Sequence, residues 1–206
     1  MKRTITAFLC SIIILILFAG LAGSALSSTE SATQQLKGSI DKLLEVLKDP
    51  ELKAEDQKEV RREKLRIIAK ERFDFRMMSQ RSLARHWKGL TDEQKDEFTE
   101  LFGSLLEDSY MSKIEAYTDE EVVYLKELVK KKKTREYAQI NTKIITDEVE
   151  IPINYRMYRQ DEKPWMVYDM IIEGVSMVNN YRSQFGQILE KKSFDSLVEQ
   201  LKDKKE

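Results

Sequence analysis

Cysteine and histidine are almost absent from this chain of 206 residues, which has one of each, Cys10 and His86. A zinc site built from several such side chains is therefore excluded. Cys10 lies inside an apolar N-terminal run, so the rest of the chain has no disulfide or thiol chemistry. A Ser-His-Asp triad would depend on His86, and no GxSxG motif accompanies it. We expect a structural or surface role for His86, and no metal or cofactor.

Glycine is also scarce, and neither sign of charge is in clear excess. The seven glycines are scattered and form no GxGxxG or phosphate-binding loop. The 35 basic residues balance 36 acidic ones, which argues against nucleic-acid binding because that function needs a basic excess. The one dense basic run is Lys130 to Lys133, followed by Arg135. It could meet anionic headgroups or an acidic partner, or be a solvated hairpin loop.

The N-terminus has the pattern of a secretory signal. Lys2 and Arg3 precede the apolar run AFLCSIIILILF, and the small residues AGLAGSALSS follow it. We expect residues 1–26 to be a cleaved signal peptide of an exported, soluble protein. The alternative is an uncleaved anchor, since the run is nearly long enough to span a bilayer. Residues 27–206 are then one domain, long enough to bury a real core.

Apolar residues at three- and four-residue steps predict helices from about 28 to 117. Asp49 and Pro50 end the first helix and open a second, in which Val60, Leu65, Ile67 and Ile68 point inward. Asp74 caps a third helix that stops at Gly89. A capping box of Thr91 and Gln94 then opens the clearest helix, whose broad apolar face continues to Ile114.

The period changes to two between about 120 and 174, which predicts four strands: EVVYLKELV, REYAQINTKIIT, VEIPINYRMYR and WMVYDMIIEG. Short polar connections, KKKKT among them, indicate antiparallel hairpins. Pro152 suggests an edge strand or a bulge. Helices return from about 175 to 204. The fold class is therefore α+β, with a helical N-terminal half packed on a curved antiparallel sheet of four to five strands.

The sheet has more apolar side chains than an ordinary core needs, and methionine and tyrosine suit a cavity for a variable ligand. Strand four offers Val167, or Met170 from its opposite face, and the long helix is expected to roof the cavity. The alternative is a filled core. The candidate lining is Phe98, Phe102, Leu105, Tyr110, Val122, Tyr124, Ile140, Ile144, Ile151, Ile153, Tyr155, Met157, Val167 and Met170.

Asp169 interrupts the apolar fourth strand. We interpret it as a buried or rim acid paired with an arginine such as Arg156, because buried charges usually persist by pairing. The alternative is a catalytic acid.

The chain resembles the MlaC-type toluene-tolerance family of periplasmic phospholipid-binding proteins. The residues that carry the resemblance are the Phe-Asp-Phe opening at 73–75, Arg-His-Trp before LTDEQ, and then IEAY, IEGVS and NYRSQF, in the family's order and spacing. Two departures are the basic first hairpin and RQDEKPW in place of a glycine-containing turn.

The resemblance implies a nuclear-transport-factor-like roll with added helices and a pocket for phospholipid tails. It also implies a monomeric carrier that maintains outer-membrane lipid asymmetry. Such a carrier moves lipid between an outer-membrane lipoprotein–porin complex and an inner-membrane ABC transporter with an MCE-domain ring. Two other readings stay open: an enzyme on the same roll that uses Asp169 or Tyr168, and a periplasmic adaptor that binds no lipid.

Overall fold

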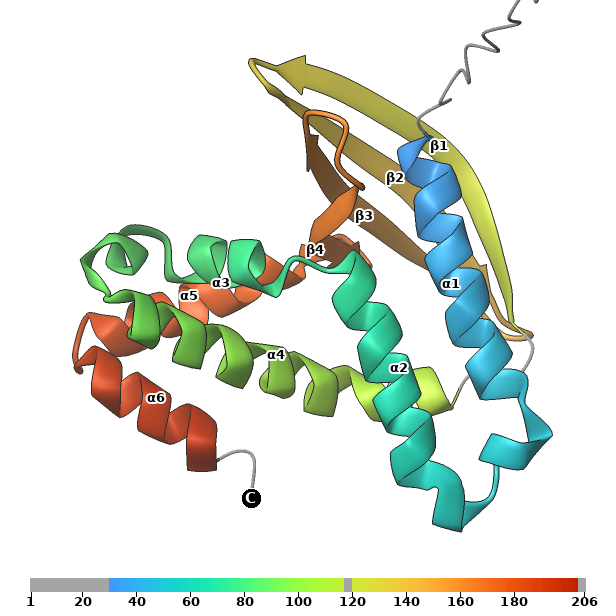
Figure 1. The fold of residues 1–206 in the computed structure, drawn as a ribbon, viewed down its shortest axis with the longest axis horizontal. Coiled ribbons are helices and arrows are strands. Elements are labelled where there is room, and N and C mark those ends of the chain that lie inside the picture. Colours follow the sequence, from blue (N-terminus) through green and yellow to red (C-terminus); the bar gives the residue numbers. More distant parts are fainter. Residues whose placement is uncertain (1–29, 117–119, 204–206) are drawn as a thin grey trace, which may run out of the picture.

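A computed structural model describes residues 30–116 and 120–203, which form six α-helices, three short 3-10 turns and one sheet (Figure 1). The expected signal peptide, 1–26, lies outside the described residues, as does the expected helix start at Ser28. Within the described ranges, no helix is long and apolar enough to cross a membrane.

The first helix, α1 (Ala32–Lys48), begins at a capping box formed by Ser31 and Gln34. Asp49 then caps as expected, but it opens only a 3-10 turn, η1 (Pro50–Leu52), and a second turn follows, η2 (Glu55–Gln57). The expectation of one continuous helix from Pro50 onward is wrong, because Ala54 adopts an extended conformation. The second α-helix, α2, spans Lys58–Arg72.

Helix α2 is more solvated than its pattern suggested. Leu65 is buried, whereas Val60 and Ile67 are 46% and 50% exposed, so their expected inward direction is wrong. A helix that packs through one narrow stripe buries about one residue per turn. Its other anchors are polar, since Arg61 and Arg62 both bind Glu115 of the long helix.

Helix α3 (Phe75–Leu83) starts as expected, with the Asp74 side chain accepting from the Met77 amide. It ends earlier than expected, because Ala84 takes a positive φ of 50° and the chain continues as the 3-10 segment η3 (Ala84–Gly89). The capping box of Thr91 and Gln94 is present and opens α4 (Asp92–Glu115).

The five strands form one antiparallel sheet in which each strand pairs with the next along the chain. This order confirms the hairpin connections, and Glu173 and Gly174, both at positive φ, make the tight turn between the last two strands. The strands are β1 (Glu121–Lys132), β2 (Arg135–Ile145), β3 (Glu150–Gln160), β4 (Met166–Ile172) and β5 (Val175–Ser176).

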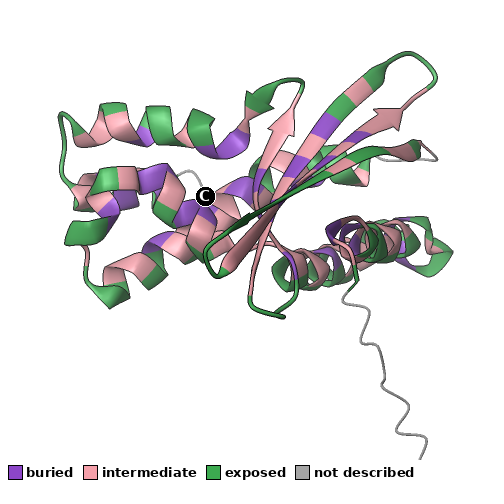
Figure 2. Ribbon diagram, turned by 90° about the horizontal axis from the view of Figure 1, so that it is seen from above, coloured by how far each residue is buried: buried purple, intermediate pink, exposed green. Residues whose placement is uncertain are grey.

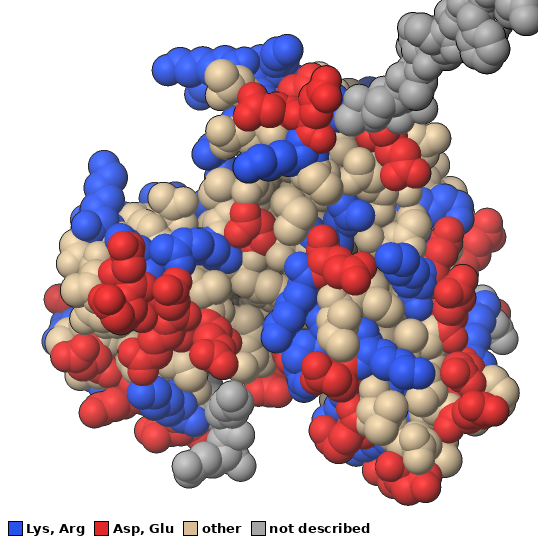
Figure 3. Space-filling view, viewed as in Figure 1, with Lys and Arg blue, Asp and Glu red and all other residues tan. Residues whose placement is uncertain are grey.

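The lysine run is part of the sheet, not a five-residue loop. Lys130, Lys131 and Lys132 pair with residues of β2, and the hairpin turns at Lys133 and Thr134 alone. Basic side chains extend from the tip of this hairpin at the top of Figure 3. The run thus lies on an exposed edge strand, where positive charge opposes edge-to-edge aggregation.

Pro152 lies in an interior strand, so the expectation of an edge or bulge there is wrong. β3 pairs with β2 on one side and β4 on the other, and its register against β2 is continuous at Pro152. The Pro152 carbonyl accepts from the Glu173 amide in the β4–β5 turn. Because the N–H and C=O of a strand residue point to the same side, the prolyl nitrogen faces this turn and no ladder bond is lost.

The described residues bury two main apolar cores (Figure 2). The helical core lies among α3, α4, α5 (Met177–Leu189) and α6 (Phe194–Asp203). The sheet core lies between β2, β3, β4 and α1. Phe73, Met170 and Ile172 contact both cores and are only half-buried. We call these three residues the seam.

Candidate functional site

One face of the sheet is apolar and turned toward α1, which we call the inner face. The register places Ile140 opposite Tyr155 and Ile144 opposite Ile151, with Thr142 and Ile153 between these pairs. The expected alternation in β3 is therefore confirmed. The polar side chains of Gln139, Asn141 and Arg156 occupy the other face, which we call the outer face.

Nine of the fourteen candidate residues come together in this sheet core. Val122 is also on the inner face, opposite Ile144, and is half-buried. The nine that gather are Tyr124, Ile140, Ile144, Ile151, Ile153, Tyr155, Met157, Val167 and Met170.

A β-bulge in β4 brings Val167 and Met170 to the same face. Met157 pairs with Val167 and Tyr155 with Met170, with a register shift between the two pairs. In a regular strand, residues three apart point to opposite faces of the sheet. On that basis Met170 was expected on the opposite face from Val167. That expectation is wrong, because a bulge sets two residues of one strand against one of its neighbour and reverses the alternation.

The helix over the inner face is α1, and the expected roof by α4 is wrong. Ala32 and Leu36 of α1 are fully buried against the sheet, and Ile40 packs beside them. Phe98 and Phe102 instead lie in the helical core, in edge-to-face contact with Phe185 of α5. Leu105 and Tyr110 also pack against that core.

Burial along the inner face is uneven. Near the start of α1, Ala138, Met157 and Val167 are at most 3% exposed. Toward the β2–β3 turn, Ile144, Ile151 and Ile172 are only half-buried. The half-buried end adjoins the seam, so the least covered part of the inner face lies where the two cores meet.

Two tyrosines place hydroxyl groups in this apolar region. Burial raises the pKa of Tyr155 to about 12. The pKa of Tyr124 is also raised, first by burial and then by the electrostatic effect of Tyr155 and Asp41. The Tyr124 hydroxyl is buried and finds no hydrogen-bond partner among the described residues. An unpaired buried hydroxyl costs about 1–3 kcal/mol.

Asp169 on the outer face is 3% exposed and fully engaged. Its carboxylate accepts from Arg156 Nη1 at 3.0 Å, from the Ser176 hydroxyl at 2.8 Å and from the Val178 amide at 3.1 Å. The predicted pairing with Arg156 is confirmed. The acid fixes β4 to the start of α5, because its three donors come from β3, from the residue before α5 and from the first turn of α5.

The remaining chemical candidates are few. His86 is half-buried, and its Nε2 accepts a hydrogen bond from Arg85 Nε–H at 3.3 Å. Within the ranges 30–116 and 120–203, no three histidine, cysteine, aspartate or glutamate side chains are placed to hold a metal ion.

Two cavities of about 400 and 580 Å³ lie beside α3, η3 and α5, and none of the fourteen candidate residues lines them. The apolar hollow expected against the sheet therefore stays a prediction.

Comparisons with known proteins identify the family of this chain. The profile of the MlaC protein family matches residues 37–203. The chain belongs to the MlaC family. The intermembrane phospholipid transport system binding protein MlaC of Haemophilus influenzae is 29% identical over 119 residues, which are 56% of this chain and 55% of that relative. The match thus spans about half the length of the relative.

A solved structure has the same fold. The phospholipid-binding protein from Ralstonia solanacearum, in complex with a phospholipid, superposes with a TM-score of 0.75 over 85% of this chain and 97% of that one, at 23% identity. The α+β fold with an open five-stranded antiparallel sheet is therefore that of a known phospholipid-binding protein.

Proposed function

We propose that this protein is a periplasmic phospholipid carrier that holds acyl chains against the inner face of the sheet. The observation that carries the proposal is the seam. Phe73, Met170 and Ile172 join two cores that are otherwise separate, and all three keep partial solvent access. Chains inserted at the seam would lie against the half-buried isoleucines beside it, without displacing the interior of either core.

Family membership supports the choice of ligand, and elementary energetics supports the need for a carrier. Burial of an acyl chain is worth about 0.8 kcal/mol per methylene, on the order of 10 kcal/mol per chain. Free lipid therefore crosses water too slowly to supply a membrane. A protein surface with an affinity near that of the bilayer can both take up and release lipid, and no covalent step is needed.

The unpaired Tyr124 hydroxyl supports a ligand with both apolar and polar groups. It lies on the inner face among apolar residues, where it can donate to an ester or phosphate oxygen of a bound lipid. We propose that the carrier exchanges lipid with the outer-membrane lipoprotein–porin complex and the inner-membrane MCE-domain transporter implied by its family. The carrier acts without enzymatic turnover.

Native mass spectrometry tests the proposal with two neighbouring residues. Ile172 and Ile171 are adjacent in β4 and both half-buried. Ile172 belongs to the seam, whereas Ile171 points to the outer face of the sheet. The parent protein should carry phospholipid after purification. Ile172→Asp should lose most of this lipid, whereas Ile171→Asp should keep it at a similar loss of thermal stability.

Two results would contradict the carrier. One is purification of the folded parent free of lipid, with none taken up from phosphatidylglycerol vesicles. The other is equal lipid loss in both variants, which would make the inner face ordinary core. A stable protein complex formed by lipid-free parent would favour the adaptor instead.

A further inference from the structure

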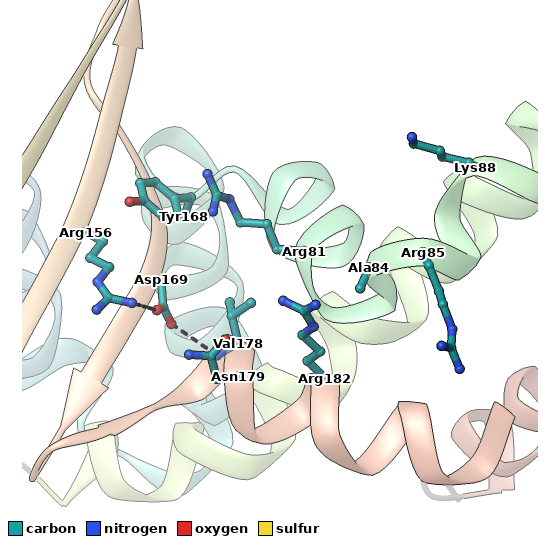
Figure 4. Close-up of a pocket in the computed structure, with 10 residues that line it drawn as sticks. All are labelled: Arg81, Ala84, Arg85, Lys88, Arg156, Tyr168, Asp169, Val178, Asn179 and Arg182. Carbon is teal, nitrogen blue, oxygen red and sulfur yellow. Dashed lines mark hydrogen bonds and ion pairs between the residues drawn. The ribbon is translucent and has the colours of Figure 1, made fainter. Parts of the chain in front are cut away.

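The cavity of about 400 Å³ lies on the far side of β4 from the inner face (Figure 4). Its walls come from α3 and η3, from α5 and from the outer face of β3 and β4. Tyr168 and Asp169 line it, while Val167 and Met170 of the same strand point the other way. A group bound here would be separated by one strand from a lipid at the seam.

The lining is strongly basic. Arg81, Arg85, Lys88, Arg156 and Arg182 line the cavity together with one carboxylate, that of Asp169, a net charge of +4. Asp169 already accepts three hydrogen bonds, one of them from Arg156. The charge that remains therefore has no counterion within the cavity.

These cations differ from others on the molecule. Arg61, Arg62 and Arg66 each form a close ion pair with a carboxylate. In the described part of the chain, the four lining cations other than Arg156 have no carboxylate within ion-pair distance. Arg85, Lys88 and Arg182 are exposed and Arg81 is half-buried, so solvent screens their mutual repulsion and the cluster presents unpaired positive charge to an anion.

Arg81 is held in a fixed position at the wall of the cavity. Its guanidinium lies 4.1 Å above the centre of the Tyr168 ring, which fixes its position. Its Nε–H group is buried and has no hydrogen-bond partner among the described residues. A buried donor without an acceptor is costly, and more so on a charged group. Arg182 of α5 lines the same cavity from the facing helix.

We propose that this cavity binds a phosphate group, distinct from the site for acyl chains. Guanidinium groups match the oxygens of a phosphate in pairs and are less strongly hydrated than an ammonium group, which suits a recessed site. The side-chain amide of Asn179, which also lines the cavity, can orient the ligand's polar substituents. The volume accommodates a phosphate ester, either a small soluble one or the headgroup of a membrane lipid.

Calorimetric titration with sn-glycerol 3-phosphate and with inorganic phosphate tests the site. The variant Arg81→Gln/Arg182→Gln should bind either probe at least tenfold more weakly than the parent. The matched control, Lys131→Gln/Lys133→Gln, removes the same charge from the β1–β2 hairpin and should bind as the parent does. Arg182→Gln alone changes an exposed side chain, and it should weaken binding of both probes without lowering the melting temperature.

Vesicle sedimentation separates the two sources of phosphate. A membrane headgroup is the source if the cavity variant, unlike the lysine control, loses binding to phosphatidylglycerol vesicles but keeps its low binding to phosphatidylcholine. A soluble ester is the source if vesicle binding is unchanged. Phosphate affinity that is equal in the parent and the cavity variant, or that falls equally in the control, would overturn the proposal. The cavity variant should retain as much lipid as the parent in native mass spectra. Failure of the phosphate-site proposal is therefore distinguishable from failure of the carrier function.

Discussion

The carboxylate of Asp169 and the guanidinium of Arg156 lie 3.0 Å apart across the β3–β4 pair. The acid is almost fully buried, whereas the side chain of Arg156 is 36% exposed. Water can therefore still solvate Arg156, but Asp169 depends on its protein donors. With Ser176 and Val178, the same carboxylate holds the first turn of α5 against the sheet.

Replacement of Asp169 by Asn should therefore act on stability. An amide has one acceptor oxygen for three donors, and we expect a loss of about 2 kcal/mol. The melting temperature should fall by roughly 5 °C, measured by circular dichroism. Asp147→Asn, in the exposed β2–β3 turn, should change it by less than about 1 °C. Lipid retained per folded molecule should be equal in all three proteins. Loss of a chemical turnover without loss of stability would instead indicate a catalytic acid.

Alkaline pH should destabilise the protein through its buried tyrosines. An unfolded tyrosine ionises near pH 10, whereas Tyr155 in the folded protein has a pKa of about 12. Stability from its burial is complete below pH 10 and is lost as the pH rises toward 12. For Tyr155 the loss amounts to about 2–3 kcal/mol. Urea unfolding at pH 8 and pH 11 should show a smaller drop for Tyr155→Phe than for the parent. Identical drops would contradict the assignment.

Acid should weaken the contact between α2 and α4. Hydrogen bonds from Arg62 and Arg61 hold the pKa of Glu115 below its usual value of 4.5. Stability from this shift is present above about pH 4.5 and is lost as the pH falls through the lowered pKa. Glu115→Gln should cost about 2 kcal/mol at pH 7 in urea unfolding, and the difference from the parent should narrow below pH 4. Glu148→Gln, on an exposed turn, should match the parent at both pH values.

Replacement of Ala84 by glycine should stabilise the folded protein. Its φ of 50° with ψ of −116° is a conformation that side chains with a Cβ rarely adopt, at a cost of about 1–3 kcal/mol. Glycine removes this strain but loses about 0.5–1 kcal/mol to the flexibility of the unfolded chain. Ala84→Gly should therefore raise the free energy of unfolding by about 1 kcal/mol. Ala69→Gly, in the interior of α2, should lower it by about 1 kcal/mol. Equal losses in both variants would show that Ala84 is unstrained.

Local patterns predicted the elements of this fold well. Alternation in β3 identified its two faces, and the caps at Asp74 and Thr91 marked the starts of α3 and α4. These features depend on neighbours within four residues, whose chemistry can be read from the sequence. The break between η1 and α2 was harder to predict, because the extended Ala54 between them has no side-chain signal.

The arrangement of the elements was less predictable. The apolar stripe of α1 was recognised, but nothing local showed that Leu36 packs on the sheet while Phe98 packs on α5. The bulge that aligns Val167 with Met170 depends on the pairing of β4 with β3. In the basic cavity, Arg81, Arg85 and Lys88 follow one another at steps of four and three residues, a signal that sequence reasoning missed. Arg182 joins them only through the packing of α3 against α5.

The position of Pro152 has a consequence for folding errors. If β3 shifted by one residue relative to β2, its apolar row would turn to water and the nitrogen of Pro152 would point at a β2 carbonyl with no hydrogen to give. Exposure of the apolar row and loss of the hydrogen bond to the β2 carbonyl would both destabilise the same misaligned intermediate. The proline thus discriminates against a wrong strand alignment while costing the native hairpin nothing.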